Sequence, residues 1–197
     1  MFKSLHRFMH SLAWIMAVVG GIVLLGLVLM ISISIAGRTV TSILHSGWMQ
    51  ANLPGFADWM IATGIGPIFG DYEFLTAGLA FSVFAFIGWC QVTGGHATVD
   101  VFTARMPERA SRILSMFIEV VFAWALILIA VQLYEGMNTQ IRRGSTTFPL
   151  QYPVWWNYAL ALVPAAISAI IGTYMAFVRI AEVFANRTLV AAHGADH

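Results

Sequence analysis

Four long apolar segments divide the chain, and all but one of its charged residues lie outside them. The segments cover residues 12–36, 74–93, 113–134 and 155–178. About 20 predominantly apolar residues are enough to cross a ~30 Å hydrocarbon core as an α-helix. A membrane β-barrel would instead show segments of about ten residues with strict alternation. The pattern predicts an all-α integral membrane protein with four transmembrane helices, forming a single membrane domain over residues 1–197.

Composition agrees with this pattern. Hydrophobic residues make up 59% of the chain and charged residues 10%, whereas soluble domains carry about 25% charged residues. A soluble enzyme, a disordered chain and a secreted disulfide scaffold are therefore excluded. The single cysteine, Cys90, excludes an intrachain disulfide and a multi-cysteine metal site. The net charge of +1 shows no basic excess, so we expect no nucleic-acid partner.

Lysine and arginine residues predict the orientation in the membrane, because cytoplasmic loops carry an excess of them. One side holds Lys3, Arg7, Arg105, Arg109, Arg112, Arg179 and Arg187, and the other holds Arg38, Arg142 and Arg143. Both termini and the middle loop are therefore expected in the cytoplasm. The first apolar segment is much longer than the 7–15 residues of a signal-peptide core, so we expect it to remain as an anchor helix.

The outer segment over about residues 38–66 is long and only weakly polar. Val40, Ile43, Leu44 and Trp48 recur at helical spacing, as do Phe56, Trp59 and Met60, and Pro54-Gly55 separates the two groups. The favoured interpretation is two short amphipathic helices in the outer membrane interface. The alternative is that the first helix simply continues to about Leu53.

Glu119 is the one carboxylate well inside a span. Such a group is costly in hydrocarbon and is a functional-site hypothesis by default, here a proton or ion site. The alternative, which we favour, is a structural carboxyl that faces another helix.

Two loop elements carry polar or rigid residues. His96 and Asp100 are four residues apart after a glycine pair. They could form a general base with its orienting partner, but they lack a nucleophile, so capping or a loop hydrogen bond is favoured. On the outer side, Pro149 and Pro153 precede Trp155, and these residues predict a stiff, interface-anchored loop.

The last helix carries small residues every four positions at Ala161, Ala165, Ala169 and Thr173. Small residues at this spacing let helices approach closely, so we expect a contact face within the bundle or against a partner. The alternative is that alanine is simply common in membrane helices.

The spans show almost no polar residues to bury, no repeat symmetry and no histidine that could ligate haem. We therefore expect no cofactor, no catalysis, and a structural unit that depends on a partner. Two alternatives remain: a self-sufficient small oligomeric transporter or channel, and a small membrane redox protein.

Three groups of residues resemble a known family. Gly37-Arg38 directly follows the first span. Glu73 opens the second span and is followed by Gly95-His96-Ala97-Thr98-Val99-Asp100, which looks like a Gly-His-x-x-Val-Asp element. The third is Thr147-x-Pro149-x-x-x-Pro153-x-Trp155-x-x-Tyr158, with Pro164 in the last helix. In this order the groups resemble the small four-helix membrane subunit of tripartite ATP-independent periplasmic (TRAP) transporters.

The resemblance implies a non-catalytic small permease subunit in the bacterial inner membrane. It would scaffold the large polytopic subunit of a sodium-gradient-driven symport system for organic anions such as carboxylates. A periplasmic substrate-binding protein and membrane lipid would be the other partners. Arg38, Glu73, His96 and Asp100 would be structural or interface residues. The segment between Arg38 and Glu73 is longer than in many members of the family, so its helices are expected to be specific to a subgroup.

Overall fold

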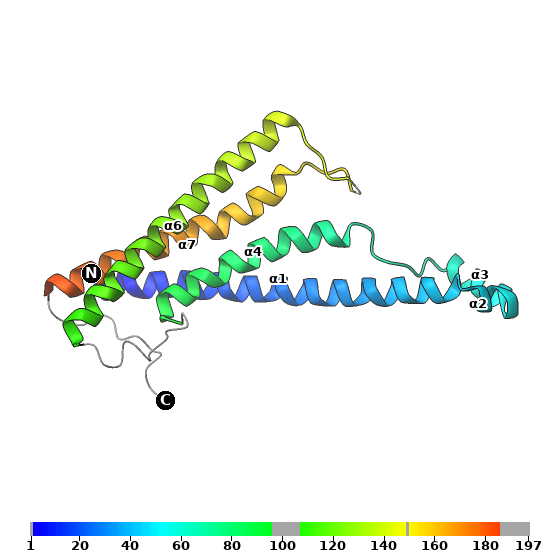
Figure 1. The fold of residues 1–197 in the computed structure, drawn as a ribbon, viewed down its shortest axis with the longest axis horizontal. Helices are drawn as coiled ribbons and strands as arrows, with labels where there is room; N and C mark the ends of the chain where they lie inside the picture. Colours follow the sequence, from blue (N-terminus) through cyan, green and yellow to red (C-terminus); the bar gives the residue numbers. More distant parts are fainter. Residues whose placement is uncertain (1, 96–106, 149, 186–197) are drawn as a thin grey trace.

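The structure is a computed structural model that describes residues 2–95, 107–148 and 150–185 (Figure 1). Most of the residues in these ranges are helical, and short loops connect the helices. The helices are α1 (Phe2–Leu44), α2 (Gly47–Asn52), α3 (Pro54–Ala62), α4 (Asp71–Thr93), α6 (Glu108–Arg143) and α7 (Trp155–Ala185). Four of them, α1, α4, α6 and α7, are long and apolar enough to cross a membrane. The predicted all-α membrane architecture is confirmed.

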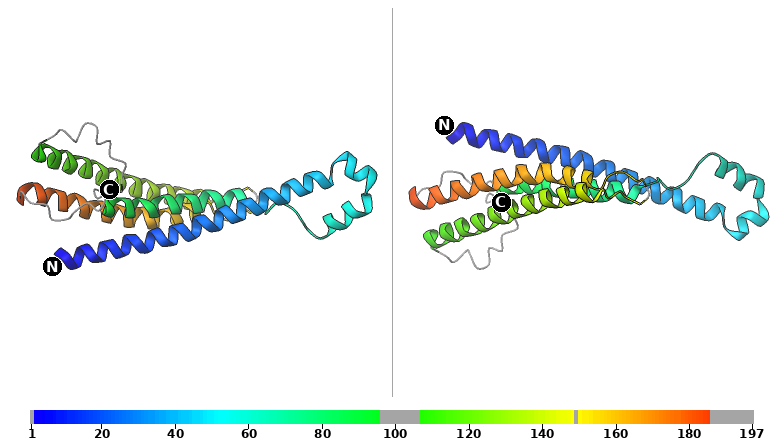
Figure 2. Two further views of the ribbon diagram at one scale, coloured as in Figure 1. Left: turned by 90° about the horizontal axis from the view of Figure 1, so that it is seen from below. Right: turned by 90° about the horizontal axis from the view of Figure 1, so that it is seen from above.

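The four long helices pack as two neighbouring pairs. Helix α1 lies along α4, α6 lies along α7, and α4 joins the pairs by packing on α7. Figure 1 shows the α6–α7 pair diverging from the α1–α4 pair toward the start of α4. Figure 2 shows that α1 continues well past the other three long helices and that α2 and α3 follow at its far end. The molecule is therefore an elongated bundle with a projection at one end.

Small residues allow close contact between neighbouring helices. A Cβ atom at Gly20 of α1 would lie 2.8 Å from the Cβ atom of Ala85 in α4. The buried Ser82 hydroxyl donates to the Gly20 carbonyl oxygen across 3.0 Å. On the other face of α4, the Ser168 hydroxyl of α7 donates to the Phe84 carbonyl oxygen across 2.7 Å. Lipid supplies little hydrophobic drive for helix association, so such contacts stabilise the bundle.

Helix α1 continues through Gly37 and Arg38 to Leu44, so these two residues lie inside the helix and not after it. Nothing in this stretch breaks a helix, because it lacks proline and one internal glycine costs only about 1 kcal/mol. The Thr39 and Thr41 hydroxyls donate to the carbonyl oxygens four residues earlier. At 43 residues, α1 is about 64 Å long.

Two short helices, α2 and α3, do follow α1, and the predicted group Phe56, Trp59 and Met60 lies in α3, but the first predicted helix was placed wrongly. Residues 40–44 belong to α1, and Trp48 belongs to α2, so they do not share one amphipathic helix. Nor does the first helix reach Leu53. Ser46 interrupts it, because its extended backbone and its side-chain oxygen, which accepts from the Met49 amide, start a new helix. Pro54 then opens α3, a position where its missing N–H has no cost.

The chain returns from α3 along α1 through two glycines with left-handed backbone angles. Gly64 and Gly70 both have φ of +78°, a conformation that glycine adopts without strain. Between them, the Gly66 carbonyl lies so close to Gly37 that a Cβ atom there would overlap it. Gly37 is therefore required by the approach of another backbone segment.

We predict that Gly37→Ala destabilises the protein by about 1–3 kcal/mol, because the returning backbone must shift away from α1. Gly21→Ala is the matched control, since no atom lies within 4 Å of its added Cβ. Alanine favours a helix over glycine, so the control should be unchanged or slightly more stable. Thermal unfolding in detergent measures both. Equal stability of the two variants would contradict the contact.

Candidate functional site

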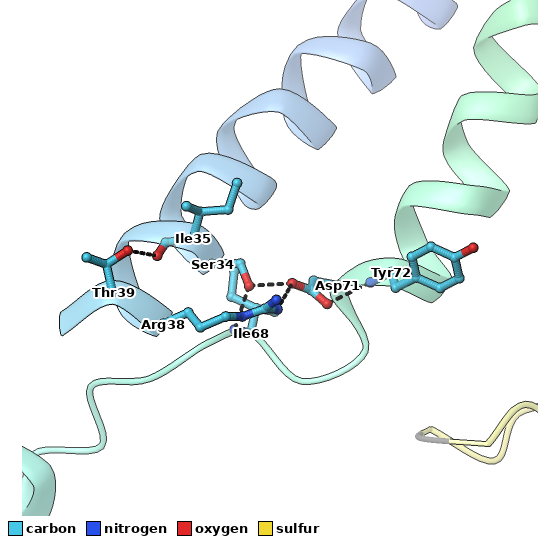
Figure 3. A network of polar contacts seen from close by, with 7 residues as sticks. All are labelled: Ser34, Ile35, Arg38, Thr39, Ile68, Asp71 and Tyr72. Atoms are coloured by element: carbon cyan, nitrogen blue, oxygen red, sulfur yellow. Dashed lines mark hydrogen bonds and ion pairs between the residues drawn. The ribbon is translucent and has the colours of Figure 1, made fainter. Parts of the chain in front are cut away.

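A polar network joins α1 to the start of α4 (Figure 3). Ser34 is fully buried, and its hydroxyl donates to Asp71 Oδ2 while accepting from the Ile68 amide at 3.1 Å. Arg38 forms an ion pair with the same Asp71 oxygen at 3.1 Å. Asp71 Oδ1 accepts from the Tyr72 amide at 2.8 Å. We call Ser34, Arg38, Ile68 and Asp71 the latch, because together they fix where α4 begins along α1.

The latch divides α1 into a packed part and a projecting part. Residues 35–44 extend about 15 Å beyond Ser34, and α2 and α3 follow at the far end (Figure 2). We call residues 35–66 the arm. Its end exposes large aromatic side chains, with Trp48 69% and Trp59 62% exposed. The candidate residue Arg38 lies at its base, with 65% of its side chain exposed. The arm therefore offers surface to a membrane or a partner.

Glu73 lies in the first turn of α4 and is only 8% exposed. Neither carboxylate oxygen has a hydrogen-bond partner among the described residues. The N-terminal end of a helix favours a negative charge, but a buried carboxylate without a donor is still costly. Glu73 is thus the least satisfied polar group among the candidate residues that the structure describes.

The loop between α6 and α7 is tied into a compact turn. Thr146 and Pro153 form an isolated bridge, and the Thr147 amide donates to the Tyr152 carbonyl oxygen. The Tyr152 hydroxyl donates to Asn157 Oδ1 across 2.7 Å.

Trp155 begins α7 at the end of this turn. It lines an apolar cavity of about 460 Å³ between α4 and α7, together with Phe81 and Leu160.

At the opposite end of α4, polar side chains from three helices meet. Gln91 of α4 is 1% exposed and donates to Glu119 Oε2 of α6. Arg179 of α7 forms an ion pair with Glu182 at 2.8 Å and attracts Glu119 electrostatically. Glu119 therefore lies at a junction of α4, α6 and α7. Over the part of the chain that the structure describes, no group of three or more His, Cys, Asp or Glu side chains could hold a metal ion.

The expectation that the spans bury almost no polar residues was wrong. Six polar residues are buried in the described ranges: Ser34, Ser82, Gln91 and Ser168 lie inside the predicted spans, and Glu73 and Glu182 lie just outside them. Serine and glutamine within an apolar run carry no sequence signal of their partner, because that partner lies on another helix. Asp71, three positions before the predicted span at residue 74, and Arg38, two positions after the first span, were the charged residues that could have indicated the latch.

The remaining candidates fall into two groups. Ala161, Ala165 and Ala169 are buried on α7 inside the bundle, where small side chains permit close packing. His96, Asp100 and Pro149 lie outside the described residues, so their roles stay predictions.

The four long apolar helices define a small multi-pass membrane protein in which several polar side chains join one helix to another. The chain belongs to the family described as tripartite ATP-independent periplasmic transporters, DctQ component, whose model matches residues 55–184. This confirms the resemblance drawn from the sequence. The match contains α4, α6 and α7 and most of α3, whereas α1 precedes it. Comparison with curated proteins gave no match, and neither did comparison with solved structures.

We predict that Ser34→Ala loosens the latch and lowers the free energy of unfolding by about 1–3 kcal/mol. The change removes the hydroxyl that serves both Asp71 and the Ile68 amide. Ser32→Ala is the matched control, because Ser32 is exposed and donates only within α1, to the Val28 carbonyl oxygen. Proteolysis within residues 63–70 should also accelerate in the Ser34 variant alone. Identical proteolysis of both variants would argue against the latch.

Proposed function

We propose that this chain is a non-catalytic subunit that scaffolds the large transport subunit of a TRAP-type uptake system. The system would use the sodium gradient to import organic anions such as carboxylates. The family match is the observation that carries the proposal. The polar contacts support it: the Gln91–Glu119 bond and the two serine bonds to Gly20 and Phe84 all join helices.

The geometry suits a stationary support. A transporter whose mobile part slides through the membrane needs a neighbour held at a fixed depth and tilt. Interfacial aromatic residues provide such anchoring, and Trp155 and Trp156 at the start of α7 would serve this role. Apolar cavities such as the one beside Trp155 would be filled by lipid or by the large subunit.

We further propose that both termini face the cytoplasm of a bacterial inner membrane. Seven of the ten lysine and arginine residues then lie on the cytoplasmic side. The arm accordingly lies on the periplasmic side, where a substrate-binding protein arrives. Arg38, exposed at the base of the arm, is available to a partner there.

The main test compares three proteoliposome preparations, which contain the large subunit, this chain, or both. The binding protein is added to each of them. We expect substrate uptake driven by a sodium gradient only from the complete set. Uptake by the large subunit without this chain would overturn the scaffold role, and saturable flux through this chain alone would do the same.

Glu119→Gln is the control within that assay. If Glu119 only joins helices, the substitution should change assembly or stability at most, because glutamine retains an acceptor for Gln91. A wild-type amount of complex that no longer transports would instead assign Glu119 to the transport step.

The orientation is tested with reporters at two positions. A fluorescent reporter that folds only in the cytoplasm should be active after His197 and inactive when inserted at Gly55 in the arm. An oxidation-dependent reporter should give the reverse result. Activity of the cytoplasmic reporter at Gly55 would refute the proposed orientation.

A further inference from the structure

Glu73 presents a carboxylate that no described residue satisfies. Both oxygens are buried, and no described residue donates to either of them. The nearby basic residue Arg38 is paired with Asp71 instead. A carboxylate in such a place calls for a cation or a donor beyond the described residues, since leaving it unpaired is costly.

The helix spacing shows what Glu73 faces. Residues three and four positions apart share a helix face, so Glu73 lies on the side of α4 that carries Gly70 and Ala77. Gly70 is in direct contact with the Leu150 side chain in the loop between α6 and α7. Ala77 lines a cavity between α4, α6 and α7. Glu73 therefore faces the α6–α7 side of the molecule and lies between this loop and this cavity.

The cavity has room for one long side chain. Its volume is about 310 Å³, and its wall combines Thr76 and Ala77 of α4 with Asn157 and Tyr158 of α7. Figure 1 shows that this is the end at which the two helix pairs diverge. On the facing loop, the Thr147 hydroxyl oxygen is also buried without a hydrogen-bond partner among the described residues. Unsatisfied polar atoms thus occur both on α4 and on the loop between α6 and α7, and the cavity is the opening between α4, α6 and α7.

We infer that this opening receives an arginine or lysine side chain from a helix of the large membrane subunit, and that Glu73 pairs with it. The inference rests on the proposed scaffold function. The charge complementarity is direct, because a buried carboxylate lacks a cation and a basic residue near the end of a neighbouring helix supplies one. A change in the Glu73 rotamer turns its carboxylate toward Thr76 and the cavity. The pair fixes the large subunit at the depth where α4 begins.

The first experiment compares Glu73→Gln and Glu73→Lys with Glu135→Gln, an exposed carboxylate on α6 that serves as the matched control. Each tagged chain is purified with the large subunit and alone. We expect Glu73→Gln to lower recovery of the large subunit several-fold and Glu73→Lys at least tenfold. The isolated Glu73→Gln chain should melt at the wild-type temperature or higher, because a buried unpaired charge is gone. The control should match wild type in both measurements.

The second experiment selects suppressors of Glu73→Lys in cells that need uptake for growth. We expect changes of an arginine or lysine in the large subunit to aspartate or glutamate. Suppressors confined to this chain would overturn the pairing, as would wild-type recovery with Glu73→Lys. A lower melting temperature of the isolated Glu73→Gln chain would indicate an internal partner and would also overturn it.

Two outcomes separate this inference from the scaffold function. If uptake requires the chain but tolerates both Glu73 variants, only the pairing with Glu73 is wrong. If the large subunit takes up substrate without the chain, the scaffold function is wrong whatever the Glu73 variants do. Loss of recovery that is restored only by phosphatidylethanolamine would assign Glu73 to a lipid ammonium group, against the pairing with a basic side chain.

Discussion

Inside a bilayer, neither water nor the hydrophobic effect holds one helix against another, and this constraint shapes the whole chain. Contact between helices depends on small residues and on polar groups that reach across. Ser82 binds the backbone of α1, Ser168 binds the backbone of α4, and Gln91 binds Glu119 of α6. Three short contacts thus link four helices whose outward surfaces remain apolar. Because the bundle contains few buried polar groups, the Glu73 carboxylate, which has no hydrogen-bond partner among the described residues, stands out.

The latch gives the molecule two parts with different character. Beyond Ser34, α1 leaves its neighbours and continues into the arm, where aromatic side chains are exposed. On the other side of the latch, before Ser34 in α1, the four long helices pack along one another. The family match contains α4, α6 and α7 but not α1. Helix α1 and residues 35–54 of the arm therefore lie outside the portion by which the family is recognised, whereas residues 55–66 lie within it.

Sequence reasoning identified the four membrane helices and the family, because long apolar runs and ordered motifs are local signals. It missed the boundary at Ser46, since a continuous helix and two short ones have similar apolar spacing. It also missed Ser34, Gln91 and Ser168, whose partners lie 28 to 84 residues away in the chain. Such pairings follow from how helices lie against each other, and no periodicity in one segment encodes them. Glu73 was singled out by its motif, but its lack of a partner emerged only from the packing.

The unbroken length of α1 has a mechanical consequence. No proline or chain break separates its first turn from the arm, so the helix behaves as one stiff rod that spans the bilayer and continues past it. Tilting a rod about 64 Å long by roughly 10° carries its far end about 11 Å sideways. A small change of angle among the packed helices is thereby magnified at the arm.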